Sequence, residues 1–444
     1  MNAAERWSAP VRRGCVMRAG SIWRILGGAA LAAALLAPVE APAVELWASE
    51  DGGRSCALDV TLRWTSLLSR ASEDTVLYPE RWSAASLSRM RWVLKANPAE
   101  WVRGEVAYEQ RARAVSEGAG AAGGAGILIS DIAAAYRLRQ VEDALVEVGT
   151  TFAYRHELDR ALIALHAGRA EIRVGRQAVG WGRGLFFGAV DFFSPFSPLE
   201  IDREWRRGVD AVRGTVPVTD LVSLDLVAAF GETSETSAFL ARLHGYAGNL
   251  DGEIVVGRRA EDDVYAVTAS FPLWDAEVHG EAALVQTPEP MADGGAFGRD
   301  DLVAVSVAGG SYNVDVGRGL YLVAEHHYSG FGVKRVGEAS ERLLAPVFLG
   351  RVLRGDTRIL GRHAAVLQAT YGAGEVRPLT LTWLFSPADG SGVLSPAVSW
   401  LFSDNLTLLA HGYIPYGRRT DAGALRSEYG GTPAGGLLQM TFYY

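Results

Sequence analysis

Segments of alternating polarity, about 8 to 12 residues long, recur along most of the chain and are bounded by Gly, Asp, Asn or Pro. In 100–111, Val102 and Val106 fall on one face, whereas Arg103 and Glu105 fall on the other. Successive side chains of a strand point to opposite faces, so this period of two predicts β-strands. Further strands are expected over 172–179, 221–230, 239–246, 264–271, 276–286, 301–312, 318–328, 379–385, 393–402, 406–416 and 437–444.

Aromatic residues gather near the ends of these segments, as at Trp64, Trp92, Trp101 and Tyr312. A soluble sandwich packs its apolar strand faces into a core. A membrane barrel turns them toward lipid, edges them with Trp and Tyr, and keeps charge in its lumen. Together with the signals at the two termini, the pattern favours a barrel over a soluble sandwich or propeller.

The N-terminal residues read as an export signal. Five arginines within 1–24 precede an apolar run from Ile25 to Ala37, and Ala41-Pro42-Ala43 follows. This order is typical of a secretory signal peptide, which we expect to be cleaved after about Ala43. Met17 is an alternative start that gives a more usual length. Beyond residue 43 no uncharged apolar stretch is long enough for a helical membrane span.

The last residues alternate again, with one face formed by Leu438, Met440, Phe442 and Tyr444. This resembles the C-terminal assembly signal of Gram-negative outer-membrane barrels. The resemblance implies periplasmic chaperones, the barrel-assembly machinery and outer-membrane lipid as partners. We therefore predict an all-β fold, a transmembrane antiparallel up-and-down barrel of about 18 strands, with 16 as the alternative. The last strand should close it against a strand near 56–65.

One connection differs from the others in length and side chains. It runs through Gly180-Trp181-Gly182-Arg183-Gly184 and an aromatic stretch before a strand resumes at Gly208. Such a loop packs against other protein, so we expect it to fold inward at about 180–207 and narrow the pore with opposed charges. The candidates for this constriction are Arg176, Arg183, Asp191, Glu200, Asp202, Arg203, Glu204, Arg206 and Arg207. The alternative is a salt-bridged plug or rim that only stabilises the barrel.

The same region resembles a known family. Arg173-Val174-Gly175-Arg176-Gln177, Gly180-Trp181-Gly182, Phe192-Phe193-Ser194-Pro195 and Arg207-Gly208-Val209-Asp210-Ala211-Val212-Arg213 are similar to the pattern of bacterial outer-membrane porin-like proteins, and to alginate-export barrels. The resemblance covers about 158–216. It implies a monomeric barrel of about 18 strands with a charged lumen.

Composition and motifs exclude several classes of function. The formal net charge is −8 and the basic residues are scattered, which disfavours a nucleic-acid partner. The two cysteines exclude a disulfide framework, and the sequence shows no nucleophile elbow and no phosphate loop, so no cofactor, metal or enzymatic activity is expected. The function expected is a passive channel for small hydrophilic solutes or ions. The alternatives are a plugged barrel that acts as an enzyme or anchor, and a polysaccharide export pore.

Overall fold

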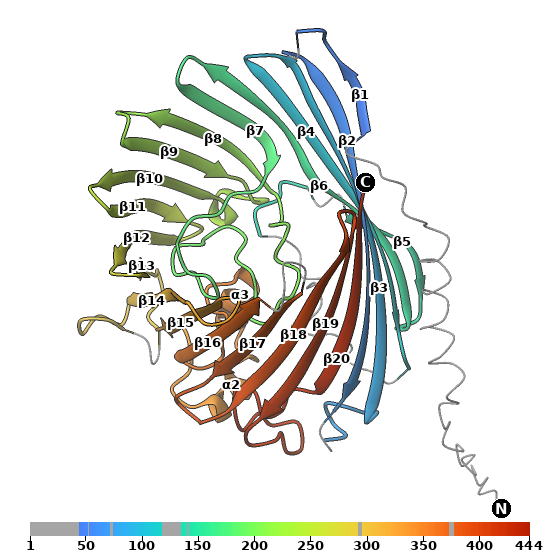
Figure 1. Ribbon diagram of the computed structural model, residues 1–444. Helices are drawn as coiled ribbons and strands as arrows, with labels where there is room; N and C mark the ends of the chain where they lie inside the picture. The colour runs from blue at the N-terminus through green and yellow to red at the C-terminus, as the bar shows by residue number, and fades with distance from the viewer. Residues whose placement is uncertain are drawn as a thin grey trace, which may run out of the picture. The chain divides into compact units, whose positions relative to one another are not determined.

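Long antiparallel strands make up most of the structure, a computed structural model (Figure 1). The described residues are 44–51, 53–71, 74–117, 135–139, 142–291, 295–372 and 377–444. They belong to one compact unit, Glu40–Tyr444. The predicted signal peptide over 1–43 lies outside them.

Alternating sequence segments become strands in the order that the polarity pattern predicts. The strands are β1 (Val44–Ala48), β2 (Ser55–Arg70), β3 (Trp82–Ala99), β4 (Val102–Val115), β5 (Glu142–Val148), β6 (Phe152–Ala167), β7 (Ala170–Gln177), β8 (Val209–Pro217), β9 (Val222–Ala229), β10 (Ala238–Ala247), β11 (Leu250–Arg259), β12 (Asp262–Leu273), β13 (Ala276–Gln286), β14 (Leu302–Val314), β15 (Leu320–Ser329), β16 (His363–Gly372), β17 (Pro378–Phe385), β18 (Gly392–Ser403), β19 (Leu406–Tyr416) and β20 (Ala434–Tyr443). The helical elements are η2 (Ser234–Thr236), η3 (Val336–Glu338), α2 (Ala339–Arg342) and α3 (Pro346–Arg354).

Within the described ranges, 18 strands form a closed antiparallel ring. β4 pairs with β6, later strands pair with their sequence neighbours, and β20 returns to pair with β2. In the closing pair, Arg63 lies opposite Thr441 and Leu67 lies opposite Leu437. The short strands β1 and β5 pair only with the ends of β2 and β6 that β20 and β7 leave open. The predicted barrel and its closure by the last strand are confirmed.

The two faces of the ring differ in polarity as the sequence predicts, with apolar side chains outside and charged side chains inside. Outward-pointing Ile163 and Val174 are 55% and 47% exposed, whereas inward-pointing Arg91 and Glu109 are each 2% exposed. A soluble protein has the opposite distribution, because it buries its large aliphatic side chains and exposes its charges. The outer face therefore suits an apolar surrounding.

The inner face itself has two regions. Charged side chains project inward from β2, β3, β4 and β6, whereas the inward positions of β9 to β16 include many Val and Ala. On β12 both faces are apolar: Val264 is fully buried inside and Val267 is exposed outside. The charged lumen that the resemblance implies is thus found on one part of the wall, whereas another part packs against protein inside the barrel.

Short turns join the strands at one end of the ring, and the longer connections lie at the other. The connection from β15 to β16 contains α2 and α3. Among the described residues, no helix combines the length and apolar character needed to cross a membrane.

Removal of residues 437–444 is expected to prevent assembly, because it takes away the β20 partners of β2 and β19 and leaves two open sheet edges. Heat-modifiable migration on gels and the protein's level in the membrane fraction measure this. Trp274→Ala, at a turn position that is 91% exposed, is the control. Normal folded levels of the truncated chain would contradict the prediction.

Candidate functional site

The connection between β7 and β8, residues 178–208, runs inside the ring and is called the inner loop (Figure 1). Its contacts reach strands far apart around the wall. In loop order these wall residues are Asp225 on β9, Glu281 on β13, Glu325 on β15, Tyr413 on β19, Arg89 on β3 and Asp159 on β6. A segment that contacts both halves of the ring follows its inner circumference.

Two buried carboxylates bind the backbone of the first half of the inner loop. Glu281 and Glu325 are each 3% exposed. Glu281 accepts hydrogen bonds from the backbone N–H groups of Arg183, Gly184, Ala189 and Val190, and Glu325 accepts them from Leu185, Phe186 and Phe187. An ionised carboxylate only accepts hydrogen bonds, so these two satisfy donors of a segment without regular secondary structure. They fix that segment to β13 and β15.

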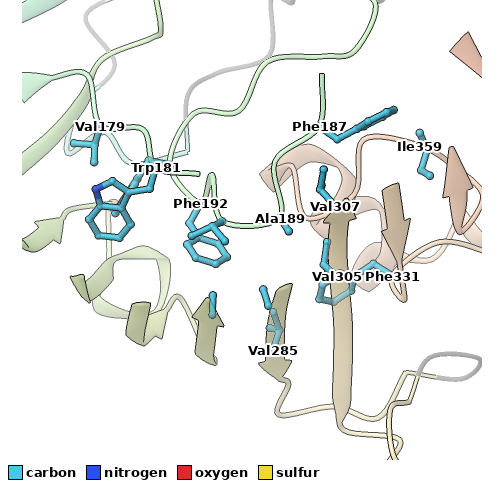
Figure 2. Packing of buried hydrophobic residues seen from close by; sticks show 14 of the residues in the cluster. Val179, Trp181, Phe187, Ala189, Phe192, Val285, Val305, Val307, Phe331 and Ile359 are labelled. Atoms are coloured by element: carbon cyan, nitrogen blue, oxygen red, sulfur yellow. The ribbon is translucent and has the colours of Figure 1, made fainter. Parts of the chain in front are cut away.

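An apolar core forms between the same half of the loop and the wall. Trp181, Phe187 and Phe192 are buried in one cluster with Val285 and Val305, which project inward from β13 and β14 (Figure 2). Full burial of a large apolar side chain stabilises by roughly 1.5–3 kcal/mol. This packing explains why the inner face of β9 to β16 is apolar.

Glycine makes the tight course of the loop possible. Gly182 has φ +100°, in the left-handed region that other residues avoid. A Cβ on Gly184 would lie 1.8 Å from the carbonyl oxygen of Phe187. The Gly-Trp-Gly-Arg-Gly sequence therefore serves close backbone approach.

The second half of the loop is held by charge. Asp202 forms ion pairs with Arg63 and with Arg89, the latter at 2.6 Å. The ring of Trp205 lies under the guanidinium groups of Arg63, Arg89 and Arg91, at 4.7, 5.0 and 5.2 Å from its centroid. Cation–π contacts of this kind add to the ion pairs in a site shielded from water. They join the loop to β2 and β3.

The acids of the loop differ in environment. Burial opposes the ionisation of Asp202, but Arg89 and Arg63 outweigh it and hold the pKa of that carboxyl below its ordinary value. Burial raises the pKa of Glu200. Burial also raises the pKa of Asp191, although Arg206 pairs with it.

Two of the predicted arginines hold the loop's own fold. Arg203 donates to the carbonyl oxygens of Leu185, Ser197, Pro198 and Glu200. Arg206 pairs with Asp191 and donates to the carbonyl oxygen of Ser194 at 2.8 Å. Both guanidinium groups are therefore engaged inside the loop.

The outer members of the predicted set are also paired. Arg176 on β7 bonds Asp210 at 2.7 Å and is 5% exposed. Arg183 pairs with Asp251, and its side chain is 29% exposed. Arg207 interacts electrostatically with Glu157 of β6 and is therefore also engaged.

Glu204 is the most exposed of the paired acids in the loop, with a side chain 37% exposed. It pairs with Arg63 and accepts a hydrogen bond from the Tyr443 hydroxyl at 3.2 Å. Because Tyr443 belongs to β20, this contact places the loop beside the closing strands. The nine predicted residues thus lie in or next to the inner loop, most of them in internal pairs.

A second connection supports the inner loop from the side of α3. Arg259 on β11 donates to the Phe192 carbonyl oxygen at 3.0 Å and pairs with Asp356. Arg351 on α3 pairs with Asp262 at 2.5 Å. The β15–β16 connection and the inner loop therefore share one buried ionic cluster.

Sequence reasoning missed the wall partners, chiefly Glu281, Glu325, Arg63 and Arg89. The available signal was a charged residue at an inward position of a strand, because such a charge must find a partner inside. The part of the chain that the structure describes contains no group of three or more His, Cys, Asp or Glu side chains that could hold a metal ion.

Comparison with family models and with curated protein sequences finds no match. Solved structures are similar in fold. Acinetobacter baumannii OccAB3 matches with a TM-score of 0.53 at 8% identity, covering 88% of this chain and 99% of that one. A BenF-like porin from Pseudomonas fluorescens Pf-5 matches with a TM-score of 0.52 at 10% identity, covering 87% and 98%. A variant of OccD1 (OprD) matches with a TM-score of 0.51 at 10% identity, covering 90% and 97%. The likeness establishes the fold, a porin-like barrel.

Replacement of Glu281 by Gln is expected to loosen the inner loop by about 1–3 kcal/mol, because the amide places donors against backbone N–H groups. Hydrogen exchange of the amides of Arg183, Gly184, Ala189 and Val190 should become faster. Glu277→Gln is the matched control, since Glu277 faces inward on the same strand and its side chain is 45% exposed. Unchanged protection in the Glu281 variant would show that the apolar packing alone holds the segment.

The Asp202 pair should make stability depend on pH in a defined direction. The folded pKa lies below the ordinary 3.8, so the contribution is present above that value and is lost as the pH falls through the folded pKa. Asp202→Asn should cost roughly 3 kcal/mol near neutral pH, because it leaves buried Arg63 and Arg89 short of a partner. It should also reduce the loss of stability on acidification.

Thermal unfolding at neutral and at strongly acidic pH measures both effects. Asp220→Asn is the control, because the Asp220 side chain is 90% exposed in its pair with Arg169. An Asp202→Asn protein with wild-type stability at both pH values would refute the anchoring role.

Proposed function

We propose that this protein is an outer-membrane porin, a passive channel for small hydrophilic solutes or ions. The observation that carries the proposal is the inside-out distribution of side chains on a closed ring, with apolar residues exposed outside and charges buried inside. Such a ring has no open sheet edge and can stand in lipid. The inner loop then supplies the constriction.

The similar solved structures support this function, since one of them is described as a BenF-like porin. Outer-membrane location, export by a cleaved signal peptide, and insertion by chaperones and the barrel-assembly machinery belong to the same proposal. So does the absence of enzymatic activity. The narrower resemblance to alginate-export barrels would make the solute a polysaccharide, and a plugged barrel would make the inner loop a stopper.

Ion conductance of the refolded chain in a planar bilayer tests the proposal. Discrete, long-lived steps are expected for an open pore. A sealed bilayer with confirmed insertion would instead favour the plugged barrel. Blockage by soluble polysaccharide, but not by small solutes, would favour export of polymers.

Selectivity should follow the exposed charges of the loop. Glu204→Gln removes a negative charge and should shift the reversal potential in a KCl gradient toward anions, whereas Arg183→Gln should shift it toward cations. Arg299→Gln is the charge-matched control for Arg183→Gln, because Arg299 belongs to an exposed pair in the β13–β14 connection. Identical reversal potentials in all four proteins would place the constriction elsewhere.

A further inference from the structure

We propose that the lumen binds a small zwitterion at the end that carries the short turns, between Arg103 and Glu105 of β4. The proposal rests on the proposed function, because it names the class of solute that such a channel would retain. It concerns a part of the barrel that is separate from the inner loop.

A cavity of about 610 Å³ lies against the inner face of β2, β3, β4, β6 and β7. Its volume is within the range of small-molecule sites, about 300–1,000 Å³. The charged side chains that line it are Lys95, Glu100, Arg103, Glu105, Glu171 and Arg173. Three are bases and three are acids, so the cavity offers charges of both signs to a solute.

Some of these charges are already neutralised by partners in the wall. The Lys95 ammonium bonds Asp59 at 2.7 Å, and the Arg173 guanidinium bonds Glu171 at 2.5 Å. Charged groups that are already paired in this way are less able to bind a solute.

Glu100, Arg103 and Glu105 remain, and of these Arg103 and Glu105 are opposite charges two residues apart on β4. Among the residues that the structure describes, neither is within ion-pair distance of an opposite charge, and Glu105 acts electrostatically on the Arg160 guanidinium of β6. Glu105 lies opposite Lys95 in the strand register, but the Lys95 ammonium is bound to Asp59. Arg103 lies opposite Ala164, which carries no charge.

Their spacing suits a ligand that carries both charges. Residues two apart on a strand share a face, and their Cα atoms are about 7 Å apart. A carboxylate can therefore meet Arg103 while an ammonium a few bonds away meets Glu105. Leu162 and Ala164, which also line the cavity, offer apolar contact to the carbon chain between the two charges.

The test uses 4-aminobutyrate with the folded full chain in detergent micelles, followed by saturation-transfer NMR. Butyrate and butylammonium, which each carry one of the two charges, are the comparison ligands. The wild type should bind 4-aminobutyrate about fivefold more tightly than either comparison ligand. Arg103→Gln combined with Glu105→Gln should abolish this preference.

A matched control is the double variant Arg299→Gln with Asp301→Asn, which removes an exposed ion pair of 2.6 Å in the β13–β14 connection. It should keep the preference. Equal affinity of the wild type for all three ligands would overturn the proposal, as would tighter binding of butyrate, which would identify an anion site. A preference that survives the Arg103 and Glu105 changes would overturn the assignment to these residues.

Bilayer conductance separates this proposal from the channel function. A conducting barrel without the preference refutes the zwitterion site alone. A folded barrel that prefers 4-aminobutyrate but does not conduct supports the site and refutes the channel.

Discussion

The hydrogen bonds from the inner loop to Glu281 and Glu325 are the constraint on which the barrel interior depends. A segment without regular secondary structure carries backbone N–H groups that must be satisfied when it is buried. A buried carboxylate is equally costly unless it accepts hydrogen bonds or meets a positive charge. Each partner therefore removes the other's penalty, and the His279 ring of β13 adds a further contact to Glu325 at 3.0 Å. The course of the loop follows from this mutual requirement.

The division of the inner wall matches the order of the loop's own sequence. Its first half is aromatic and meets the Val and Ala positions of β9 to β16, whereas its second half is charged and meets the arginines of β2 and β3. The first part ends at Phe192, whose carbonyl oxygen accepts a hydrogen bond from Arg259. The second part begins at Asp202, which forms an ion pair with Arg63. The loop therefore has one way to lie along the wall, because reversing it would put carboxylates against valines and would leave the buried arginines of β2 and β3 without an acid.

The strands could be predicted from the sequence because period-two alternation is a local property, and the closing pair because the last segment alternates like the others. The loop's position could not, since its partners lie far away in sequence: Gly184 and Glu281 are 97 residues apart, and Phe186 and Glu325 are 139 apart. On β12 the polarity of a residue also fails to predict which face it lies on, because buried Val264 and exposed Val267 have the same side chain. Its charge made Arg203 a candidate for the pore constriction, but only the fold shows that its guanidinium group binds carbonyl oxygens of the loop.

Pairing inside the loop limits which charges can set selectivity. An acid and a base in contact cancel much of each other's field beyond their own separation, so Asp202 with its two arginines contributes little at a distance. The same pairing makes Asp202 important for stability, because its removal leaves buried arginines without a negatively charged partner. Glu204 differs, since its side chain is partly exposed and an exposed ion pair contributes little to folding. Stability and selectivity can therefore be separated by experiment at Glu204 and at Arg183, whereas at Asp202 any change in permeation would be mixed with a change in the loop's position.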